Sequence, residues 1–306
     1  KGYWQIPMDD ESKECTAFQT PIGLMQWNFM PFGLSNAPAT FARTMRLLLD
    51  GVQNCVSYFD DILIHSSSWS SHVQTLIQIL ERLRKHGFTA RPSKVFLAFS
   101  EIEFLGHMVG KGSQKPEVSK VNKILNIEAP KTKKHVKSLM GLLGYYRKFI
   151  PNFADLSAPL TDLLKKAKPN KVIWSDKCEN ALKQIKDIFS SDPILVLPDL
   201  EKQFILRTDA SDFGIGGVLM QFHDDMLMPC GYASRKLLER EQRYSVVERE
   251  CLAIVFAVSK FAKYLMMTSF EIQTDHKPLQ FLQKGKANNG RLMRWALTLQ
   301  EFDYSI

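Results

Sequence analysis

Residues 56–64 read Val56-Ser57-Tyr58-Phe59-Asp60-Asp61-Ile62-Leu63-Ile64. Two runs of β-prone side chains flank a pair of acids, and this pattern predicts a β-hairpin with its turn at Asp60-Asp61. At a turn both carboxylates can reach one side, where a divalent cation relieves their repulsion. Phosphoryl transfer uses such cations to activate the attacking hydroxyl and to stabilise the leaving group. An isolated Asp-Asp pair is more often an ordinary polar turn, so the surrounding sequence decides between the two interpretations.

Helices are expected on both sides of this hairpin. Upstream, Ser35 is a natural N-cap, Pro38 fits the first turn, and Gly51 ends the helix. Its apolar face is formed by Phe41, Met45 and Leu48. A second helix is expected from about residue 70 to 87, with an apolar side formed by Val73, Leu76, Ile77, Leu80 and Leu83. Short strands are expected within the first 30 residues and between 95 and 109.

The rest of the chain first becomes helical and then returns to strands. Prolines separate four expected helices at 116–127, 133–149, 154–166 and 176–190. Beyond a boundary near Leu197-Pro198-Asp199 the expected order is three strands, a long helix, a strand and a helix. Their ranges are 204–209, 214–222, 226–233, 245–264, 270–275 and 289–300. This order predicts an α/β domain.

Composition suggests about two globular domains with a basic middle. The chain has 306 residues, 45% hydrophobic and 24% charged, with a net charge of +8. Residues 101–150 hold ten Lys or Arg against four acids. The lysines that make up most of this excess are Lys111, Lys115, Lys120, Lys123, Lys131, Lys133, Lys134 and Lys137. They predict salt-sensitive, sequence-independent binding of a polyanion, although a solvated helix face is the simpler interpretation of the charge alone.

The five cysteines and the absence of long apolar runs limit the class of protein. Cys15, Cys55, Cys178, Cys230 and Cys251 are scattered, with no zinc-type spacing, and are interpreted as reduced thiols of an intracellular protein. No apolar run reaches the roughly 18 residues of a membrane span, so no membrane is expected as a partner.

Three further acidic residues lie at the ends of predicted strands or near the start of a predicted helix. Asp209 closes one strand, Asp275 ends another, and Glu250 lies near the start of the long helix. Such acids can converge at a sheet edge and hold two metal ions. Each alone is more often a solvated side chain.

Several segments together resemble the reverse transcriptases of gypsy-like long-terminal-repeat retrotransposons. Tyr58-Phe59-Asp60-Asp61 resembles the (Tyr/Phe)-x-Asp-Asp signature, and residues 30–41 resemble the motif that contacts nucleotide and template. Residues 2–6 resemble the segment after the first catalytic aspartate, and residues 104–107 resemble the primer grip. The RNase H domain of the same elements is resembled by residues 207–211, 244–250 and 273–279. The resemblance covers essentially the whole chain.

The resemblance implies an α/β fold class in three parts. These are an α+β palm at residues 1–110, a helical thumb and connection at 111–198, and an RNase H-like α/β domain with a mixed sheet at 199–306. The implied activities are RNA-directed DNA synthesis and cleavage of the RNA strand in RNA–DNA hybrids. The implied cofactor is Mg²⁺ or Mn²⁺, two ions per active site.

The resemblance also implies roles for individual residues. Catalytic metal ligands would be Asp60, Asp61, Asp209, Glu250 and Asp275. The nucleotide site would be formed by Tyr3, Phe32, Gly33 and Lys94. The primer grip would be formed by Phe104, Leu105, Gly106 and His107.

Four of these assignments have structural alternatives. Tyr3 and Phe32 can be core aromatics, and Lys94 a solvated lysine. Glu250 is preferred to Glu248 because it directly precedes the stretch that resembles the family's Leu-Leu-Ala. His276 is interpreted as a cap of the next turn, and not as a metal ligand.

Two family carboxylates are expected to lie outside this chain. The first palm aspartate would fall three residues upstream of Lys1, together with the fingers, and a fourth RNase H acid would fall beyond Ile306. Asp303 is not its match. Residues 1–306 alone are therefore expected not to polymerise, and the RNase H part keeps three of its four acids.

The implied partners are an RNA template, a DNA primer and product, RNA–DNA hybrid and dNTPs, together with the protease and integrase of the polyprotein. The implied location is the cytoplasm, in virus-like particles, and the nucleus. Two alternatives remain: a non-catalytic nucleic-acid-binding relic or domesticated protein, and an unrelated metal nuclease, which would explain only the second half.

In the segment Tyr145-Tyr146, the apolar spacing favours core packing of the tyrosines over base stacking.

Overall fold

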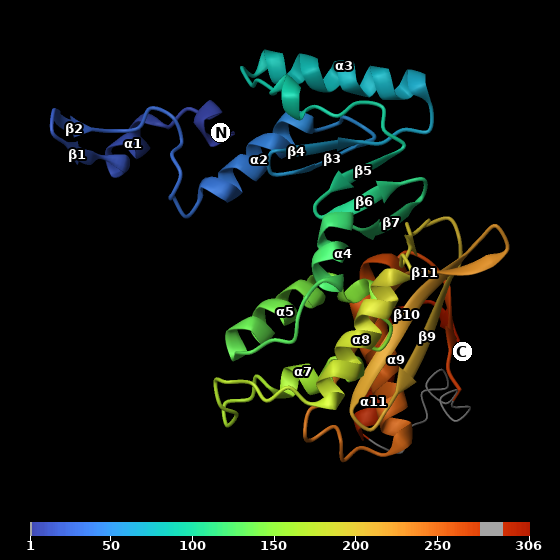
Figure 1. The fold of residues 1–306 in the computed structure, drawn as a ribbon. Helices are drawn as coiled ribbons and strands as arrows, with labels where there is room; N and C mark the ends of the chain where they lie inside the picture. Colours follow the sequence, from blue (N-terminus) through green and yellow to red (C-terminus); the bar gives the residue numbers. More distant parts are fainter. Residues whose placement is uncertain (1, 276–289) are drawn as a thin grey trace. The chain divides into compact units, whose positions relative to one another are not determined.

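The computed structural model of the chain describes residues 2–275 and 290–306. The chain forms two compact units, residues 1–99 and residues 100–306 (Figure 1). Both contain helices and small sheets, so the expected α/β class is confirmed. The expected domain boundaries near residues 110 and 198 stay predictions.

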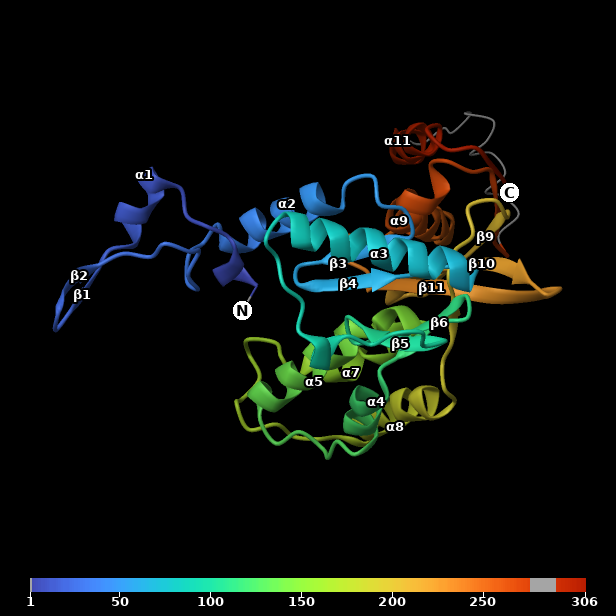
Figure 2. The same cartoon turned by 90° about the horizontal axis from the view of Figure 1, so that it is seen from above.

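The first unit consists of two hairpins and two long helices. Its elements are α1 (Asp10–Lys13), β1 (Phe18–Thr20), β2 (Gly23–Met25), α2 (Ala37–Leu49), β3 (Cys55–Tyr58), β4 (Asp61–Ile64) and α3 (Trp69–Lys85). Helices α2 and α3 contact one another and the β3–β4 hairpin, and the apolar core of the unit lies where they meet (Figure 2).

Helix α2 buries the face predicted for it but begins differently. Phe41 is 3% exposed, as the spacing predicted. The N-cap is Asn36, and not Ser35, and its side chain makes no capping hydrogen bond. Pro38 occupies the second position of the helix and has no N–H. One of the two backbone N–H groups that could donate a hydrogen bond to the N-cap side chain is therefore missing.

Helix α3 is rotated relative to the predicted apolar side. Ser68 caps it by accepting a hydrogen bond from Ser71 N–H. The buried residues are Thr75, Ile79 and Leu83, whereas Ile77 and Leu80 are about half exposed. The prediction was wrong for Ile77 and Leu80. The side of α3 that faces inward is decided by its contacts with α2 and β4, and these contacts cannot be read from the spacing of apolar residues along the helix.

The second unit begins with a four-stranded antiparallel sheet and a layer of helices. The strands are β5 (Glu101–Phe104), β6 (His107–Gly110), β7 (Ser113–Pro116) and β8 (Leu195–Val196). The helices are α4 (Val118–Leu125), α5 (Lys133–Tyr145), α6 (Phe153–Leu156), α7 (Ala158–Asp162) and α8 (Asp176–Ser190). One continuous core joins α4, α5, α7 and α8.

The unit ends with a five-stranded mixed sheet in the order β11-β10-β9-β12-β13. Its elements are β9 (Phe204–Ala210), β10 (Gly214–His223), β11 (Met226–Lys236), α9 (Val246–Leu265), β12 (Phe270–Gln273), α11 (Gly290–Leu299) and β13 (Tyr304–Ser305). β9 pairs antiparallel with β10 and parallel with β12. Helix α9 lies along β9 and β10 (Figure 1), so close that a Cβ on Gly217 would be 2.6 Å from that of Ala257. The expected order of elements and the mixed sheet are confirmed.

The cysteines and the helices bear on two general expectations. All five cysteines are free thiols. Among the helices in the described segments, none combines the length and the apolar character needed to cross a bilayer.

Candidate functional site

The acidic hairpin of the first unit forms at the expected place, with its turn one residue earlier. Tyr58 pairs with Asp61, so the turn consists of Phe59 and Asp60, and Asp61 is the first residue of β4. Phe59 has a φ of 51°, which is uncommon for an aromatic residue, and its ring packs edge-on against Tyr58 at 4.8 Å between centroids. Both carboxylates are exposed, and neither makes an ion pair within the described residues.

The start of the chain lies beside this hairpin. A Cβ on Gly2 would be 2.9 Å from the Phe41 ring and 3.8 Å from the Asp60 Cβ, so only glycine fits without a shift. Tyr3 packs against both Phe41 and Phe32, each at 5.4 Å between centroids. The structure therefore brings Tyr3, which follows Gly2, close to the acidic turn, and Phe32 packs against Tyr3.

The four residues expected in the nucleotide site differ in exposure and in backbone conformation. Phe32 is 61% exposed, so the core alternative does not describe it, whereas half-buried Tyr3 contacts the core of the unit. Gly33 has a φ of +96°, a conformation that favours glycine. Lys94 is exposed at the end of a short 3₁₀ turn, Pro92–Lys94, and makes no ion pair with a described residue.

The expected primer-grip residues form the tight turn between β5 and β6. Phe104 pairs with His107, and the two turn residues have positive φ, 49° at Leu105 and 70° at Gly106. The Tyr146 hydroxyl donates a 2.7 Å hydrogen bond to the Gly106 carbonyl, and the Tyr145 hydroxyl donates one to the Leu105 carbonyl. Two hydroxyl groups at the end of α5 thus hold the backbone of the turn in place.

The same two tyrosines surround His107. Its ring stacks on Tyr145 with centroids 5.4 Å apart and planes 9° apart, and it meets the edge of Tyr146 at 5.5 Å. Burial, reinforced by the charge of Lys148, lowers the pKa of His107 to about 4. Core packing is confirmed for Tyr146, which is 1% exposed, but it was wrong for Tyr145, which is about half exposed and stacks on the histidine.

The three acids of the second unit lie at one edge of the mixed sheet. Asp209 is next to the end of β9, and Asp275 lies just beyond the end of β12. These strands are parallel neighbours, so their carboxyl ends meet at the same edge. Glu250 approaches from α9, and its carboxylate is close enough for the charges of Asp275 and Asp209 to act on it.

Glu250 is the electrostatically unusual member of this group. It is 5% exposed, and its Oε2 atom is buried without a hydrogen-bond partner in the described structure. Burial, followed by repulsion from Asp275 and Asp209, raises the pKa of Glu250 to about 7. Within residues 2–275 and 290–306, no three His, Cys, Asp or Glu side chains are already close enough to enclose an ion.

Glu248, which was considered as an alternative to Glu250, takes part in structural contacts. Its backbone and side chain complete a capping box with Ser245 at the start of α9. Its carboxylate also forms a 2.7 Å ion pair with Arg291. Both contacts stabilise the start of α9. His276 lies outside the described residues.

Sequence reasoning missed two polar residues beside the acids. An open depression of about 390 Å³ lies over β9 and the end of β12, and it is lined by Arg207, Thr208, Asp209, Gln273, Thr274 and Asp275. Arg207 and Gln273 each precede a predicted acid by two positions. Strand alternation places residues two apart on one face, so this signal was present in the sequence.

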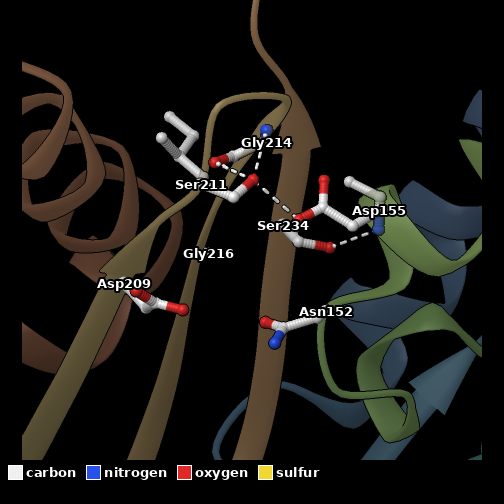
Figure 3. Close-up of a pocket in the computed structure, with 9 residues that line it drawn as sticks. Asn152, Asp155, Asp209, Ser211, Gly214, Gly216 and Ser234 are labelled. Atoms are coloured by element: carbon white, nitrogen blue, oxygen red, sulfur yellow. Dashed lines mark hydrogen bonds between the residues drawn. The ribbon is translucent and has the colours of Figure 1, made fainter. Parts of the chain in front are cut away.

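A third missed residue, Asp155, holds the loop after Asp209. Its Oδ2 accepts a 2.8 Å hydrogen bond from the Ser211 hydroxyl, which itself accepts from Gly214 N–H at 2.9 Å (Figure 3). A Cβ on Gly214 would be only 2.3 Å from Asp155 Oδ1, so the approach requires glycine. The loop between β9 and β10 is therefore fastened to α6.

Asn152 lines a small pocket together with Asp155 and Asp209, and the pocket's volume of about 10 Å³ is at the lower limit for holding one water molecule. Its Oδ1 is 3.3 Å from where a Gly216 Cβ would be, and Gly216 pairs with Asp209 across β10 and β9. Figure 3 shows Asn152 and Asp209 on either side of Gly216. No sequence motif predicted this neighbour, because it comes from a different layer of the unit.

The basic segment is partly neutralised. Lys115 pairs with Asp192 at 3.0 Å, and longer ion pairs join Lys111 to Glu101 and Lys120 to Glu117. Four other lysines are exposed and make no ion pair with a described residue: Lys123, Lys131, Lys134 and Lys137. A smaller set of lysines than expected is thus available to a polyanion.

Comparison with known proteins identifies two matching families. A family described as "Reverse transcriptase (RNA-dependent DNA polymerase)" matches residues 1–109. A family described as "RNase H-like domain found in reverse transcriptase" matches residues 199–302.

Similar curated proteins are polyproteins of transposons. The chain is 40% identical to the retrovirus-related Pol polyprotein from transposon 297 of Drosophila melanogaster, over 100% of this chain and 29% of that protein. It is 36% identical to the transposon Tf2-3 polyprotein of Schizosaccharomyces pombe, over 99% of this chain and 23% of that protein. The chain thus spans less than a third of the length of these relatives.

Similar solved structures come from a foamy viral protease-reverse transcriptase. Its complex with double-stranded DNA, in the form called dRH, matches with a TM-score of 0.88 at 25% identity, covering 100% of this chain and 55% of that one. Its complex with RNA/DNA hybrid matches with a TM-score of 0.84 at 25% identity, covering 100% and 43%.

Proposed function

The chain belongs to the reverse transcriptase and RNase H family of retrotransposon Pol polyproteins, and on this premise we propose which residues act and on what. The first unit contributes the palm of an RNA-directed DNA polymerase. The second contributes a nuclease that cleaves the RNA strand of RNA–DNA hybrids. The observation that carries the proposal is the grouping of Asp209, Asp275 and buried Glu250 at one sheet edge.

The nuclease site has the chemistry of a cation site. Enzymes of these families generally use divalent metals. Three carboxylates that repel one another, one of them with a buried oxygen that lacks a partner, are stabilised by a hard cation. Mg²⁺ or Mn²⁺, two ions in the site, would supply an activated water and charge stabilisation at the cleaved phosphate. Asp209, Glu250 and Asp275 would hold the ions.

The residues of the first unit are proposed to act in the same way on a nucleotide. Asp60 and Asp61 are exposed carboxylates on a tight turn and would hold two metal ions. Tyr3 and Phe32 form an aromatic surface beside this turn, suited to the sugar and base of a dNTP. Gly33 lets the backbone approach, and Lys94 would neutralise a phosphate.

The primer grip and the free lysines are proposed to hold the nucleic acid. The rigid turn Phe104–His107 would contact the DNA primer, because the tyrosines below it keep its backbone in place. The unpaired lysines near residues 123–137 would bind phosphates of the RNA template and its hybrid. The foamy viral complexes with double-stranded DNA and RNA/DNA hybrid support nucleic-acid partners of this kind. Protease and integrase domains of the polyprotein, and an intracellular location, are proposed from the relatives alone.

Cleavage of a hybrid by the full chain tests the proposal. An RNA strand labelled at its 5′ end and annealed to DNA is expected to be cut with Mg²⁺ or Mn²⁺ and to stay intact with EDTA. Asp209→Asn and Asp275→Asn should each lower the rate by about a thousandfold or more, since the ions supply several kcal/mol. Asp303→Asn, an exposed acid outside the group, is the control and should leave the rate unchanged. Tight binding of the hybrid without cleavage in either metal would instead support the non-catalytic nucleic-acid-binding alternative.

A further inference from the structure

Arg207 lies on the same face of the sheet as Asp209. Gly217 packs against Ala257 of α9, and its cross-strand partner is Thr208, so Thr208 faces the helix. Side chains alternate along a strand, and Arg207 and Asp209 therefore both point to the face away from α9. Arg207 precedes Asp209 by two residues, about 6.6 Å along the strand.

Gln273 stands opposite Arg207 on the neighbouring strand. The two residues are direct partners in the parallel pairing of β9 and β12. Gln273 precedes Asp275 by two positions, just as Arg207 precedes Asp209. Arg207 and Gln273 thus form a polar row on the sheet. Two positions further along each segment lies an acidic row, Asp209 near the end of β9 and Asp275 just beyond β12, and all four residues line one depression.

A chain of hydrogen bonds fixes the arginine. Its Nε donates to Gln273 Oε1 at 2.7 Å, and Gln273 Nε2 donates to Glu271 Oε1 at 2.8 Å. The two terminal nitrogens of the guanidinium make no hydrogen bond or ion pair with any residue in the described segments. An arginine that is held by Nε while its two terminal nitrogens stay free is arranged in advance for an anion.

The surroundings identify the kind of anion. Arg207 and the two acids line one open depression of about 390 Å³ over the parallel strands. Asp209 and Asp275 attract anions only through bound cations, whereas Arg207 attracts them directly. A strand of nucleic acid offers regularly spaced phosphates, and one phosphate at the acidic row leaves another near the polar row.

We propose that Arg207, held by Gln273, binds a backbone phosphate of the nucleic-acid strand whose neighbouring phosphates lie over Asp209 and Asp275. The site rests on the proposed function, because it takes the same strand as the nuclease. It contacts phosphate and not a base edge, so it contributes affinity and register without sequence preference.

The salt dependence of hybrid binding by the full chain tests this site. Dissociation constants for an RNA–DNA hybrid are measured by fluorescence anisotropy over a series of KCl concentrations, with Ca²⁺ present. Arg207→Gln is expected to reduce the slope of log K against log salt by about 1 and to weaken binding roughly tenfold at low salt. Arg207→Lys keeps the charge and should keep the slope near that of the unchanged chain.

Two further variants make the test specific. Lys260→Gln removes one exposed charge from α9, on the opposite side of the sheet, and should leave the slope unchanged. Gln273→Ala leaves the charge but frees the arginine, and is expected to weaken binding about threefold with the slope kept. This variant also tests the site should Arg207→Gln fold poorly.

The outcomes separate the site from the proposed function. If the unchanged chain binds the hybrid and Arg207→Gln has the same slope, the phosphate site is wrong and the proposed function stands. An equal loss of slope in Lys260→Gln would also overturn the site, because the effect would then belong to net charge. Failure of the unchanged chain to bind hybrid at any salt concentration would overturn both.

Discussion

Tyr146, at the end of α5, donates a 2.7 Å hydrogen bond to the backbone carbonyl of Gly106, in the turn between β5 and β6. The ring is 1% exposed, and burial raises the pKa of Tyr146 to about 12, so the hydroxyl remains a donor at any physiological pH. This bond joins the expected primer grip to the helical layer of the second unit.

Tyr146→Phe should lower the free energy of unfolding by about 1 kcal/mol, because it removes the shorter bond to the Gly106 carbonyl and leaves only the 3.3 Å bond from Glu117 N–H. Urea unfolding measured by circular dichroism checks this. Tyr145→Phe is the matched control: it loses a bond to Leu105, but water can replace that bond at a half-exposed ring. Equal losses in the two variants would show that the buried bond has no special weight.

His107 should make the chain less stable in mild acid. Its pKa of about 4 in the folded state lies below the usual 6.5, so between these values the unfolded chain takes up a proton that the folded chain does not. Stability that is present above pH 6.5 is therefore lost as the pH falls towards 4, by at most ~3 kcal/mol. His107→Gln should flatten this part of the profile, and His135→Gln, at an exposed site, should not. A profile unchanged by His107→Gln would contradict the prediction.

Glu250 should have the opposite pH dependence in the absence of metal. Its pKa of about 7 lies above the usual 4.5, so in this interval the folded chain holds a proton that the unfolded chain has released. The stability that Glu250 contributes is greatest below pH 4.5 and is lost as the pH rises to 7, by at most ~3 kcal/mol. Glu250→Gln should be more stable than the unchanged chain at pH 8 and similar to it at pH 4, as measured by thermal unfolding in EDTA. A variant less stable at pH 8 would refute this.

Divalent cations should reverse that loss. Mg²⁺ or Mn²⁺ at pH 8 is expected to raise the melting temperature, with about 2.7 kcal/mol gained at a hundredfold excess over the dissociation constant. Asp209→Asn or Asp275→Asn should remove most of this gain, and Asp303→Asn should retain it. Differential scanning calorimetry with and without metal measures the effect, and identical gains in all variants would place the ions elsewhere.

Gly214→Ala should destabilise the second unit by about 1–3 kcal/mol, because its Cβ would lie 2.3 Å from Asp155 Oδ1. Gly231→Ala is the control, since its Cβ would meet only Phe261, at an ordinary 3.6 Å. Combining Gly214→Ala with Asp155→Ala should cost less than the sum of the single changes, as measured by urea unfolding. Strict additivity would mean that the close approach causes no strain.

Periodicity and turn chemistry were sufficient to predict most elements. The alternation around residues 56–64 predicted the β3–β4 hairpin, and the order of strands and helices after residue 204 predicted the mixed sheet with α9. The turn itself was misplaced by one residue because Phe59 adopts a positive φ, which local preferences do not favour. The grouping of Asp209, Glu250 and Asp275 was expected from resemblance, and the structure brings the three acids to one edge.

Contacts between layers could not be predicted in this way. Asp155 reaches Ser211 from a short helix far upstream, and no local pattern marks either residue as part of a pair. The spacing of Leu143, Tyr146 and Ile150 predicted the burial of Tyr146, but it did not contain the position of His107, on which the exposed ring of Tyr145 stacks. Arg207 and Gln273 could have been found from alternation, yet their pairing depends on the register of two strands distant in the sequence.

The pairing of Ser113 with Val196 has a consequence for the order of folding. Strand β8 joins β7 only after the chain has passed through all the helices from α4 to α8, and Leu197 N–H then bonds to the Gly112 carbonyl at 2.8 Å. Such a distant pairing must overcome the loop-closure entropy of everything between its partners, and it forms slowly compared with local hairpins. The β5–β6 hairpin can therefore form early, during synthesis, while its sheet is completed only when the last of these helices has collapsed onto the others.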